Sequence, residues 1–147
     1  MNLSRFSDYS LRVLMYAALK DDESFMIDEV TEAYGISRNH VAKVIHNLSK
    51  LCYLETRRGR GGGIRLACPA SEIRLGKLVQ ETENQPVIVE CFSVETNSCP
   101  ISNQCRLKGL LAEAMEAFYE SLNRYTLSDL VAGPLRKRLG STLFEKA

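Results

Sequence analysis

The sequence predicts a mainly α-helical protein with a small β-hairpin wing, arranged as a winged helix-turn-helix followed by a long C-terminal helix. Three features of the 147-residue chain lead to this fold class. Two short helical patterns meet at Gly35, a stretch rich in glycine and arginine lies between two strand-like segments, and a long amphipathic pattern begins near residue 106. The apolar content of 45% is enough for a real core.

The first helix is expected over residues 7–19, with Ser7 as its N-cap. Apolar residues recur there every three or four positions and form one face: Leu11, Leu14, Met15 and Ala18. The acidic run 21–23 then breaks the pattern.

Residues 27–34 predict a short helix that ends at Gly35, because glycine takes the left-handed backbone of a helix end at little cost. Ser37 is a suitable N-cap for a second helix over residues 38–50. That second helix has one apolar face: Val41, Val44, Ile45 and Leu48. Its other face is polar or basic: Arg38, Asn39, Lys43, His46 and Asn47. Two short helices joined by a tight glycine turn predict a helix-turn-helix.

A β-hairpin, or wing, is expected next. Residues 53–58 and 64–66 are strand-like and flank the sequence GRGGG at positions 59–63. Pro69 ends this hairpin, and a short helix is expected from about Leu75.

The chain closes with a helix of roughly 20 residues, about 30 Å long. Its apolar stripe has no evident partner within so small a domain: Leu107, Leu110, Leu111, Ala114, Phe118, Leu122 and Tyr125. Long terminal helices of this kind often pair between two copies, so the sequence favours a homodimer. The last stretch, 127–139, is amphipathic but broken at residues 133–134, and we expect the tail after Leu139 to fray.

Positive charge is concentrated on the predicted helix-turn-helix and wing. Residues 36–65 contain seven lysines and arginines and one acid, so they carry +6; because the whole chain carries +1, the remainder carries −5. Such a local basic field predicts a double-stranded DNA partner. The residues expected to reach base edges begin the second helix: Ser37, Arg38, Asn39 and His40. Those expected at phosphates or in the minor groove are Lys43, Arg57, Arg58 and Arg60. The alternative is a helix-turn-helix that serves only for packing.

Three cysteines, Cys91, Cys99 and Cys105, follow with the spacing C-x7-C-x5-C. The first 20 residues are interrupted by charges and do not read as a signal peptide, so we expect a cytoplasmic protein whose thiols stay reduced. The spacing is too wide for a zinc knuckle and suits a loop around something bulkier than one ion, such as an iron–sulfur cluster. Three unrelated thiols remain the alternative.

Cys105 is expected in the first turn of the long helix, capped by Ser102 or Asn103, where the helix dipole favours a thiolate. Cys52 reads as a small core residue, and Cys68 has no evident role.

The stretches FSDYSLRVL, GISRNHVAKVIHNLS and RGRGGGIRL, followed by three cysteines and a long helix, resemble the Rrf2 superfamily of winged-helix regulators. Within it, the chain looks most like the nitric-oxide-sensing repressors. The resemblance implies a homodimeric transcriptional repressor of nitric-oxide-detoxification genes, acting on a palindromic operator and not as an enzyme. It also implies a cluster, with 4Fe–4S favoured over 2Fe–2S, held by the three cysteines and by Asp8 from the partner subunit.

This resemblance divides the chain into a DNA-binding domain (1–85), a cluster-binding loop (86–105) and a dimerisation helix with a tail (106–147). One alternative is a 2Fe–2S regulator of iron–sulfur or redox homeostasis. Those relatives have a histidine three residues after the third cysteine, where this chain has Lys108. Both histidines, His40 and His46, lie on the predicted recognition helix. A zinc-binding or metal-free winged-helix regulator is the other alternative. For Asp8, the simpler role is a charge in the first helical turn, paired with Arg12.

Overall fold

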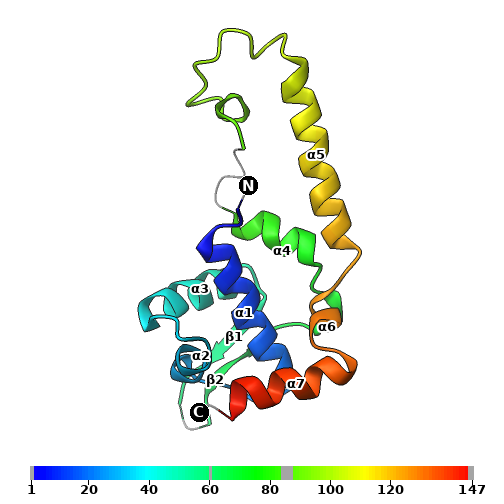
Figure 1. Cartoon of the computed structure of the whole chain (residues 1–147). Coiled ribbons are helices and arrows are strands. Elements are labelled where there is room, and N and C mark those ends of the chain that lie inside the picture. Colours follow the sequence, from blue (N-terminus) through cyan, green and yellow to red (C-terminus); the bar gives the residue numbers. More distant parts are fainter. Residues whose placement is uncertain (1, 60, 84–87, 146–147) are drawn as a thin grey trace.

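The computed structural model describes residues 2–59, 61–83 and 88–145. The described helices and strands are α1 (Arg5–Leu19), α2 (Ile27–Tyr34), α3 (Arg38–Lys50), β1 (Leu54–Arg57), β2 (Gly63–Leu66), η1 (Ala70–Glu72), α4 (Leu75–Thr82), η2 (Glu90–Phe92), α5 (Arg106–Asn123), α6 (Leu127–Leu130) and α7 (Gly133–Phe144). The mainly helical fold with one antiparallel hairpin is the fold class expected from the sequence (Figure 1).

Helix α1 begins at Arg5, because Ser4 is its N-cap. The Ser4 hydroxyl accepts a hydrogen bond from the backbone N–H of Ser7 at 3.1 Å. Ser7 itself is fully buried inside the helix, so the prediction that it caps α1 is wrong. The same helix end is tied to the end of α4. The Glu83 carboxylate accepts from the Ser4 N–H at 2.8 Å, and the Thr82 hydroxyl donates to Ser7 Oγ at 3.0 Å.

The helix-turn-helix forms as the sequence predicts. Helix α2 ends at Gly35, whose φ of +65° is the left-handed conformation that glycine takes without strain. Ser37 then caps α3, since its hydroxyl accepts from the backbone N–H of His40. The two helices bury their apolar faces against the core: Val30, Val41, Val44 and Leu48 are all at most 1% exposed.

Strands β1 and β2 form the hairpin, with Leu54 opposite Leu66 and Arg57 opposite Gly63. Phe25 adds a short third pairing at the edge of this sheet. Its N–H donates to the carbonyl of Ile64, and the N–H of Ile64 donates back, both at 2.9 Å. The pairing joins the segment before α2 to the wing.

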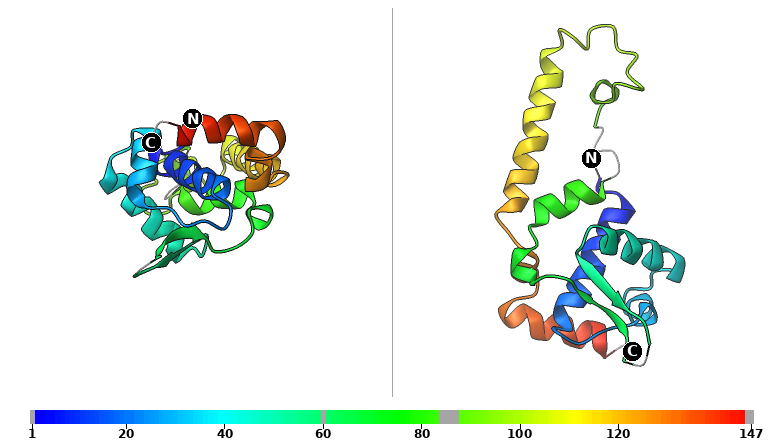
Figure 2. Two further views of the ribbon diagram at one scale, coloured as in Figure 1. Left: turned by 90° about the horizontal axis from the view of Figure 1, so that it is seen from below. Right: turned by 180° about the vertical axis from the view of Figure 1, so that it is seen from behind.

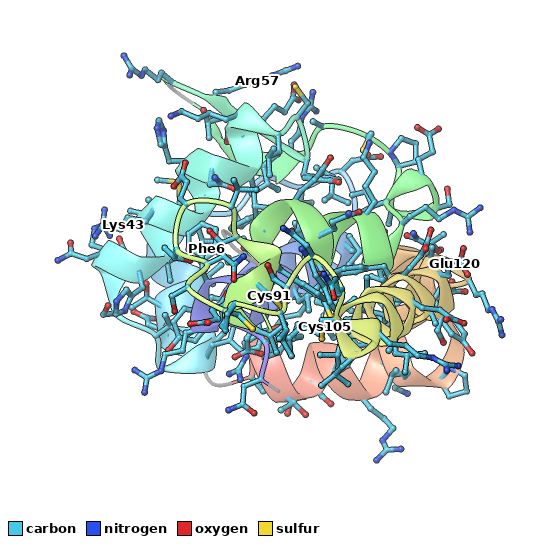
Figure 3. The ribbon with its side chains drawn as sticks, turned by 90° about the horizontal axis from the view of Figure 1, so that it is seen from above. Phe6, Lys43, Arg57, Cys91, Cys105 and Glu120 are labelled. Carbon is cyan, nitrogen blue, oxygen red and sulfur yellow. The ribbon has the colours of Figure 1, made fainter. Side chains whose placement is uncertain are left out.

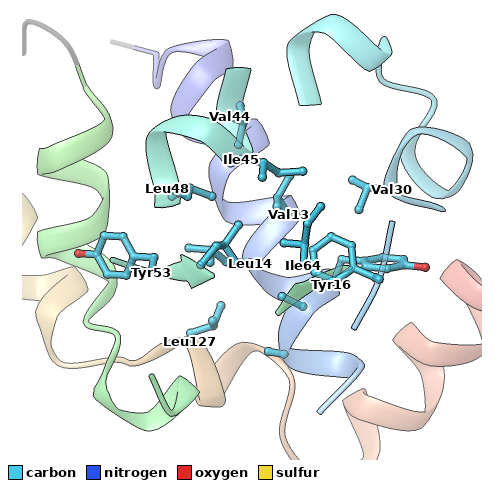
Figure 4. Packing of buried hydrophobic residues seen from close by; sticks show 14 of the residues in the cluster. Val13, Leu14, Tyr16, Val30, Val44, Ile45, Leu48, Tyr53, Ile64 and Leu127 are labelled. Carbon is cyan, nitrogen blue, oxygen red and sulfur yellow. The ribbon is translucent and has the colours of Figure 1, made fainter. Parts of the chain in front are cut away.

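Helix α1 runs through the core (Figure 4). Its Val13 and Leu14 have no exposed surface, and its Tyr16 ring packs edge-on against Phe25 and Phe144, with 5.3 Å between ring centroids in each pair. Each fully buried side chain of this size contributes about 1.5–3 kcal/mol to folding. The core therefore combines residues of α1 with residues of α7, which lie far apart in the sequence.

The C-terminal helices pack back onto α1 (Figure 2). Pro134 stands in the first turn of α7, where its missing N–H is not needed. Arg136 of α7 donates to the carbonyl of Leu19 at 3.1 Å and pairs with Asp21 at 2.5 Å. Because α7 continues to Phe144 and Leu143 is buried, the expectation that the tail frays after Leu139 is wrong.

Helix α5 projects away from this compact body and carries the cysteine loop at its far end (Figures 1 and 2). Only its C-terminal part packs against another helix, α4. None of its residues is buried in the single chain, and Leu107 and Leu110 are 59% and 51% exposed. Among the helices described, none is long and apolar enough to cross a membrane. The predicted boundary between residues 85 and 86 falls outside the described residues.

Candidate functional site

The first turn of α3 presents the predicted base-reading residues to solvent: Ser37, Arg38, Asn39 and His40 are all exposed. Ser37 is held locally, since its hydroxyl lies 2.8 Å from Nδ1 of His40. The imidazole of His40 also lies against the ring of Tyr9 from α1, at 5.9 Å between ring centroids. The start of α3 is thus exposed and polar, and its His40 packs against Tyr9 of α1.

Arg38 forms an ion pair with Asp28 in the first turn of α2, a partner that the sequence analysis did not identify. The two side chains are 59% and 63% exposed, so the pair is solvated. Exposed pairs of this kind are worth about 0.2–1 kcal/mol. The guanidinium can therefore leave Asp28 for a stronger acceptor at little cost.

Further basic residues extend from α3 to the wing. Lys43 on α3 and Arg57 on β1 both project outward at the margins of the domain (Figure 3). Arg58 is exposed beside Arg57, and Arg60 lies outside the described residues. Glu55 interrupts this basic surface, because its carboxylate is 3.7 Å from Arg57 and also pairs with Arg65. The Glu55 carboxylate therefore neutralises part of the positive charge of the wing.

The cysteine loop follows the C-terminal end of α4 in the sequence and leads into α5. Cys91 is in the η2 turn and Cys99 follows a turn at Asn97, whose side chain accepts from the Cys99 N–H at 3.1 Å. Cys105 is itself the N-cap residue of α5, without a side-chain cap hydrogen bond. The predictions that it sits in the first turn, and that Ser102 or Asn103 caps the helix, are therefore wrong. Its position still places the thiol at the positive end of the helix dipole.

The loop is held together by its own polar contacts. The Asn97 amide donates to the Ser102 hydroxyl at 2.8 Å, and the Ser98 hydroxyl donates to the Glu90 carboxylate at 3.2 Å. None of the loop residues that the structure describes is buried, and Val94 is 97% exposed. Such a loop can rearrange around a ligand without breaking a packed core.

An open hollow of about 760 Å³ lies where the loop meets α5, lined by Phe92, Ser102, Asn103, Cys105, Lys108, Gly109 and Ala112. Lys108, which stands where the sequence resemblance leads us to expect a histidine in a 2Fe–2S regulator, lines this hollow together with Cys105. Of the three loop thiols, only Cys105 faces the hollow.

The described residues include no set of three or more histidine, cysteine, aspartate or glutamate side chains arranged to hold a metal ion. The joint ligation by Cys91, Cys99 and Cys105 stays a prediction. Their chemistry does fit a thiophilic metal or cluster. All three thiols are free and only half-buried, and residues 88–105 of the loop include no buried residue that would resist their convergence.

Asp8 lies in the first turn of α1 and forms a two-pronged contact with Arg12, as the sequence suggested. The distances are 2.8 Å from Oδ2 to the guanidinium Nη2 and 3.1 Å from Oδ1 to Nε. The Arg12 guanidinium also lies 5.9 Å from the ring centroids of Tyr9 and Tyr34. Asp8 therefore has an intrachain partner, and ligation from a partner subunit remains a prediction.

Cys52 is exposed, so the prediction that it is a core residue is wrong. It has a left-handed backbone, with φ of +60°, directly after the C-cap of α3. The sequence signal was available but weak. Cys52 is the residue directly after the C-cap of a helix, and helices commonly end in a left-handed conformation at this position.

An exposed reading helix, a hairpin wing and a thiol-bearing loop on a projecting helix together define a winged-helix transcription regulator. The family model for Rrf2, described as "Iron-dependent Transcriptional regulator", matches residues 3–133. The chain belongs to the Rrf2 family, a class of regulators and not of enzymes.

Among curated proteins, the HTH-type transcriptional regulator NsrR of Oceanobacillus iheyensis is 48% identical over 132 residues, covering 89% of this chain and 90% of that protein. NsrR of Geobacillus kaustophilus is 44% identical over 147 residues, covering 99% of both chains. The resemblance to Rrf2 regulators that the sequence predicted is confirmed by the family model and by these relatives.

Solved structures share the fold at lower identity. The oxidized form of Staphylococcus aureus CymR superposes with a TM-score of 0.69 at 22% identity, over 90% of this chain and 98% of that one. The structure titled T. potens IscR gives a TM-score of 0.69 at 20% identity, over 89% of this chain and 86% of that one.

Proposed function

We propose that this chain is a homodimeric repressor that binds a palindromic DNA operator, and that an iron–sulfur cluster reactive toward nitric oxide controls its affinity. Release from the operator would induce genes for nitric-oxide detoxification. The observation that carries the proposal is the presence, in one chain, of an exposed basic α3 and three free thiols on a loop at the tip of α5. The NsrR names of the similar proteins point the same way.

DNA recognition would rest on α3 and the wing. Arg38 and Asn39 stand at the solvent-exposed start of α3, where a major-groove helix makes its base contacts. Arginine suits guanine and asparagine suits adenine, by paired hydrogen bonds to the base edge. Lys43, Arg57 and Arg58 would position the domain on phosphates.

The loop thiols would hold the cluster, with Cys91, Cys99 and Cys105 as ligands and Asp8 of the second subunit as a weak fourth donor. When bound, the cluster supplies iron that reacts with nitric oxide. The 4Fe–4S form is favoured, and Lys108 supports this choice because a lysine is a poor substitute for the histidine ligand of the 2Fe–2S regulators.

A continuous series of contacts connects the loop to the reading head. Cys105 begins α5, and Asn123 at the other end of that helix accepts from the backbone N–H of Lys77 in α4 at 2.8 Å. The end of α4 is bound in turn to the start of α1, through Thr82 and Ser7. A changed restraint on Cys105 would therefore reach the helix that supports α3. A coupling of about 1–3 kcal/mol changes operator affinity roughly 5–150-fold.

The test is a gel shift with anaerobically purified protein and a palindromic duplex. Protein with the visible absorbance of an iron–sulfur cluster should bind, and nitric oxide should release it. The variant Cys105→Ser should lose the absorbance and the response to nitric oxide, whereas Cys52→Ser, outside the loop, should keep both. Equal binding by untreated and nitric-oxide-treated protein would refute the proposal, and colourless protein that still responds would point to zinc or a metal-free mechanism.

A further inference from the structure

Two thiols outside the loop, Cys52 and Cys68, flank the two strands of the hairpin at the base of the wing. The ladder of the hairpin pairs Leu54 with Leu66. One position further out, the carbonyl of Tyr53 accepts from the backbone N–H of Ala67 at 3.0 Å. Cys52 and Cys68 are the next residues outward from this bonded pair, one on each arm of the hairpin. Their attachment to a hydrogen-bonded pair keeps the two backbones close, and a disulfide requires Cα atoms about 4.4–6.8 Å apart.

The backbone at Cys52 is unusual for a residue with a side chain. Cys52 follows the C-cap of α3 with φ of +60°, and the next N–H, of Tyr53, returns to the carbonyl of Leu48 at 2.9 Å. Glycine normally takes this place, as Gly35 does after α2. The exposed thiol has no packing role, and its weak contact is to the carbonyl of Lys50 at 3.9 Å. Neither backbone preference nor core packing explains a cysteine here.

Cys68 is the more sheltered member of the pair. It is half-buried and lines a surface hollow of about 590 Å³ beside Pro69 and Ala70. Burial raises the pKa of the Cys68 thiol, and negative charge on Glu72 and on Cys52 raises it further. The backbone hydrogen bond between Ala67 and Tyr53 keeps the two thiols in the same region of the wing base. Cys68 stays protonated while exposed Cys52 is open to an incoming reagent.

We propose that Cys52 and Cys68 are a redox-sensitive pair that closes to a disulfide across the base of the wing when a low-molecular-weight disulfide is present. The Cys52 thiolate attacks one sulfur of glutathione disulfide, releasing one glutathione thiolate and leaving a mixed disulfide on Cys52. The Cys68 thiolate then attacks the Cys52 sulfur and releases the second glutathione. Two protein thiols are oxidised, one glutathione disulfide is reduced, and the two thiol protons pass to the two glutathione thiolates.

Closure would join the end of α3 to the segment after β2 and enclose residues 52–68, which include Arg57 and Arg58. It would fix the wing relative to the reading helix without involving Cys91, Cys99 or Cys105. This modification site is independent of the proposed cluster.

The experiment uses the full chain, treated with glutathione disulfide, alkylated, digested with trypsin and analysed by mass spectrometry without reduction. Trypsin places Cys52 in residues 51–57 and Cys68 in residues 66–74, and puts all three loop cysteines in residues 78–106. We expect peptide 51–57 joined to peptide 66–74, a species that dithiothreitol abolishes. Oxidation within 78–106 is scored separately, so loss of the cluster and failure of this pair give different readouts.

Single variants test the order of attack. Cys68→Ser should accumulate a glutathione adduct on peptide 51–57, whereas Cys52→Ser should leave peptide 66–74 free of glutathione and open to alkylation. The proposal is overturned if the wild-type protein yields both peptides alkylated and unlinked. It is equally overturned if either thiol joins peptide 78–106 instead, or if the adduct forms preferentially on Cys68.

Discussion

Arg38 has a different partner in the free protein from the one expected on DNA. Its ion pair with Asp28 is solvent-exposed and holds the guanidinium beside the first turn of α2. A guanine edge offers two acceptors that match the planar guanidinium, so the exchange of partners favours DNA. On the proposed operator, Arg38 would exchange Asp28 for a base edge.

The variant Arg38→Ala should weaken operator binding by about 1–3 kcal/mol and relax the preference at one base position, because a paired contact to a base edge is lost. Arg58→Ala is the matched comparison. As a phosphate contact, its loss should weaken binding to every sequence alike and reduce the slope of log affinity against log salt by about 1. Fluorescence anisotropy with operator and scrambled duplexes measures both. Equal losses on both duplexes for Arg38→Ala would remove Arg38 from the base-reading group.

Glu29 is the acceptor for three donors, two of which join α1 to α2. Its carboxylate accepts from the Tyr16 hydroxyl at 3.1 Å and from the Met26 N–H at 2.8 Å, and it pairs with Lys20 at 2.7 Å. Burial alone raises the pKa of Glu29, but the hydrogen bonds from Lys20, Met26 and Tyr16 outweigh it and lower the pKa below the ordinary value. The ionised form is thus the one that stabilises the fold.

A lowered folded-state pKa means that this stabilisation is present above the unfolded pKa, about 4.3, and is lost as the pH falls through the folded value. Glu29→Gln should therefore lower the free energy of unfolding by about 1 kcal/mol at pH 7. The difference from wild type should shrink as the pH falls below about 4. Urea denaturation at several pH values measures it, with the exposed Glu23→Gln as a control of equal charge change. A deficit independent of pH would show that Glu29 acts through packing alone.

At the scale of elements, α4 and α5 cross in close contact at Gly76. Gly76 faces the backbone carbonyl of Tyr119 so closely that a Cβ there would collide with it, and with the side chain of Asn123. The same Asn123 amide oxygen accepts from the Lys77 N–H, and Arg74 donates to the Asn123 carbonyl at 3.2 Å. A glycine is required at this crossing for steric reasons, and the projecting helix depends on it.

Gly76→Ala should push α5 away from α4 and lower stability by about 1–3 kcal/mol, since the obstructing atom is backbone and cannot turn aside. Gly140→Ala in α7 is the matched control. A Cβ there meets only the Phe144 ring at 3.7 Å, so the helix should be unchanged or slightly more stable. Thermal unfolding by circular dichroism compares the two. Equal melting temperatures would mean that the crossing relaxes freely.

Local signals account for the elements that the sequence predicted well. Gly35 and Ser37 define the turn because their backbone and capping preferences act within a few residues, and α2 and α3 have the bounds that were expected. The misplaced features depend on distant partners. Ser4 caps α1, and its own N–H donates to the distant Glu83. Helix α7 extends to Phe144 because Phe144 packs on Tyr16 and Arg136 donates to the Leu19 carbonyl, both in α1.

The candidate site divides in the same way. Exposure of residues 37–40 follows from the amphipathic pattern of α3 and was predictable. The ion pair between Arg38 and Asp28 was not, because it crosses the turn between two helices. Convergence of the three loop cysteines stays a prediction, because the proposed cluster and the proposed second subunit lie outside what a single sequence pattern specifies.

At the scale of the whole molecule, the unpaired apolar stripe of α5 is the feature that a second copy would cover. Leu107 and Leu110 are more than half exposed on a helix that has no buried residue of its own. Pairing of α5 with its counterpart would also set the separation of the two α3 helices, and therefore the spacing of operator half-sites.

Leu110→Lys should convert the proposed dimer to a monomer and reduce operator affinity by at least tenfold, because a charge cannot be buried unpaired in an apolar interface and one half-site contact is lost. Glu120→Lys, on the polar face of the same helix, should remain dimeric. Light scattering after size exclusion gives the mass, and circular dichroism should show both variants folded. A dimeric Leu110→Lys protein would place the interface elsewhere.

The seating of α7 on α1 has a consequence for biogenesis. Tyr16 meets Phe144 and the end of α1 meets Arg136, so α1 is fully enclosed only after α7, which lies far along the chain, has been synthesised. The thiol loop precedes α7 in the sequence and is therefore made while this side of α1 is still open. Closure of the core around α1 is thus a late step of folding.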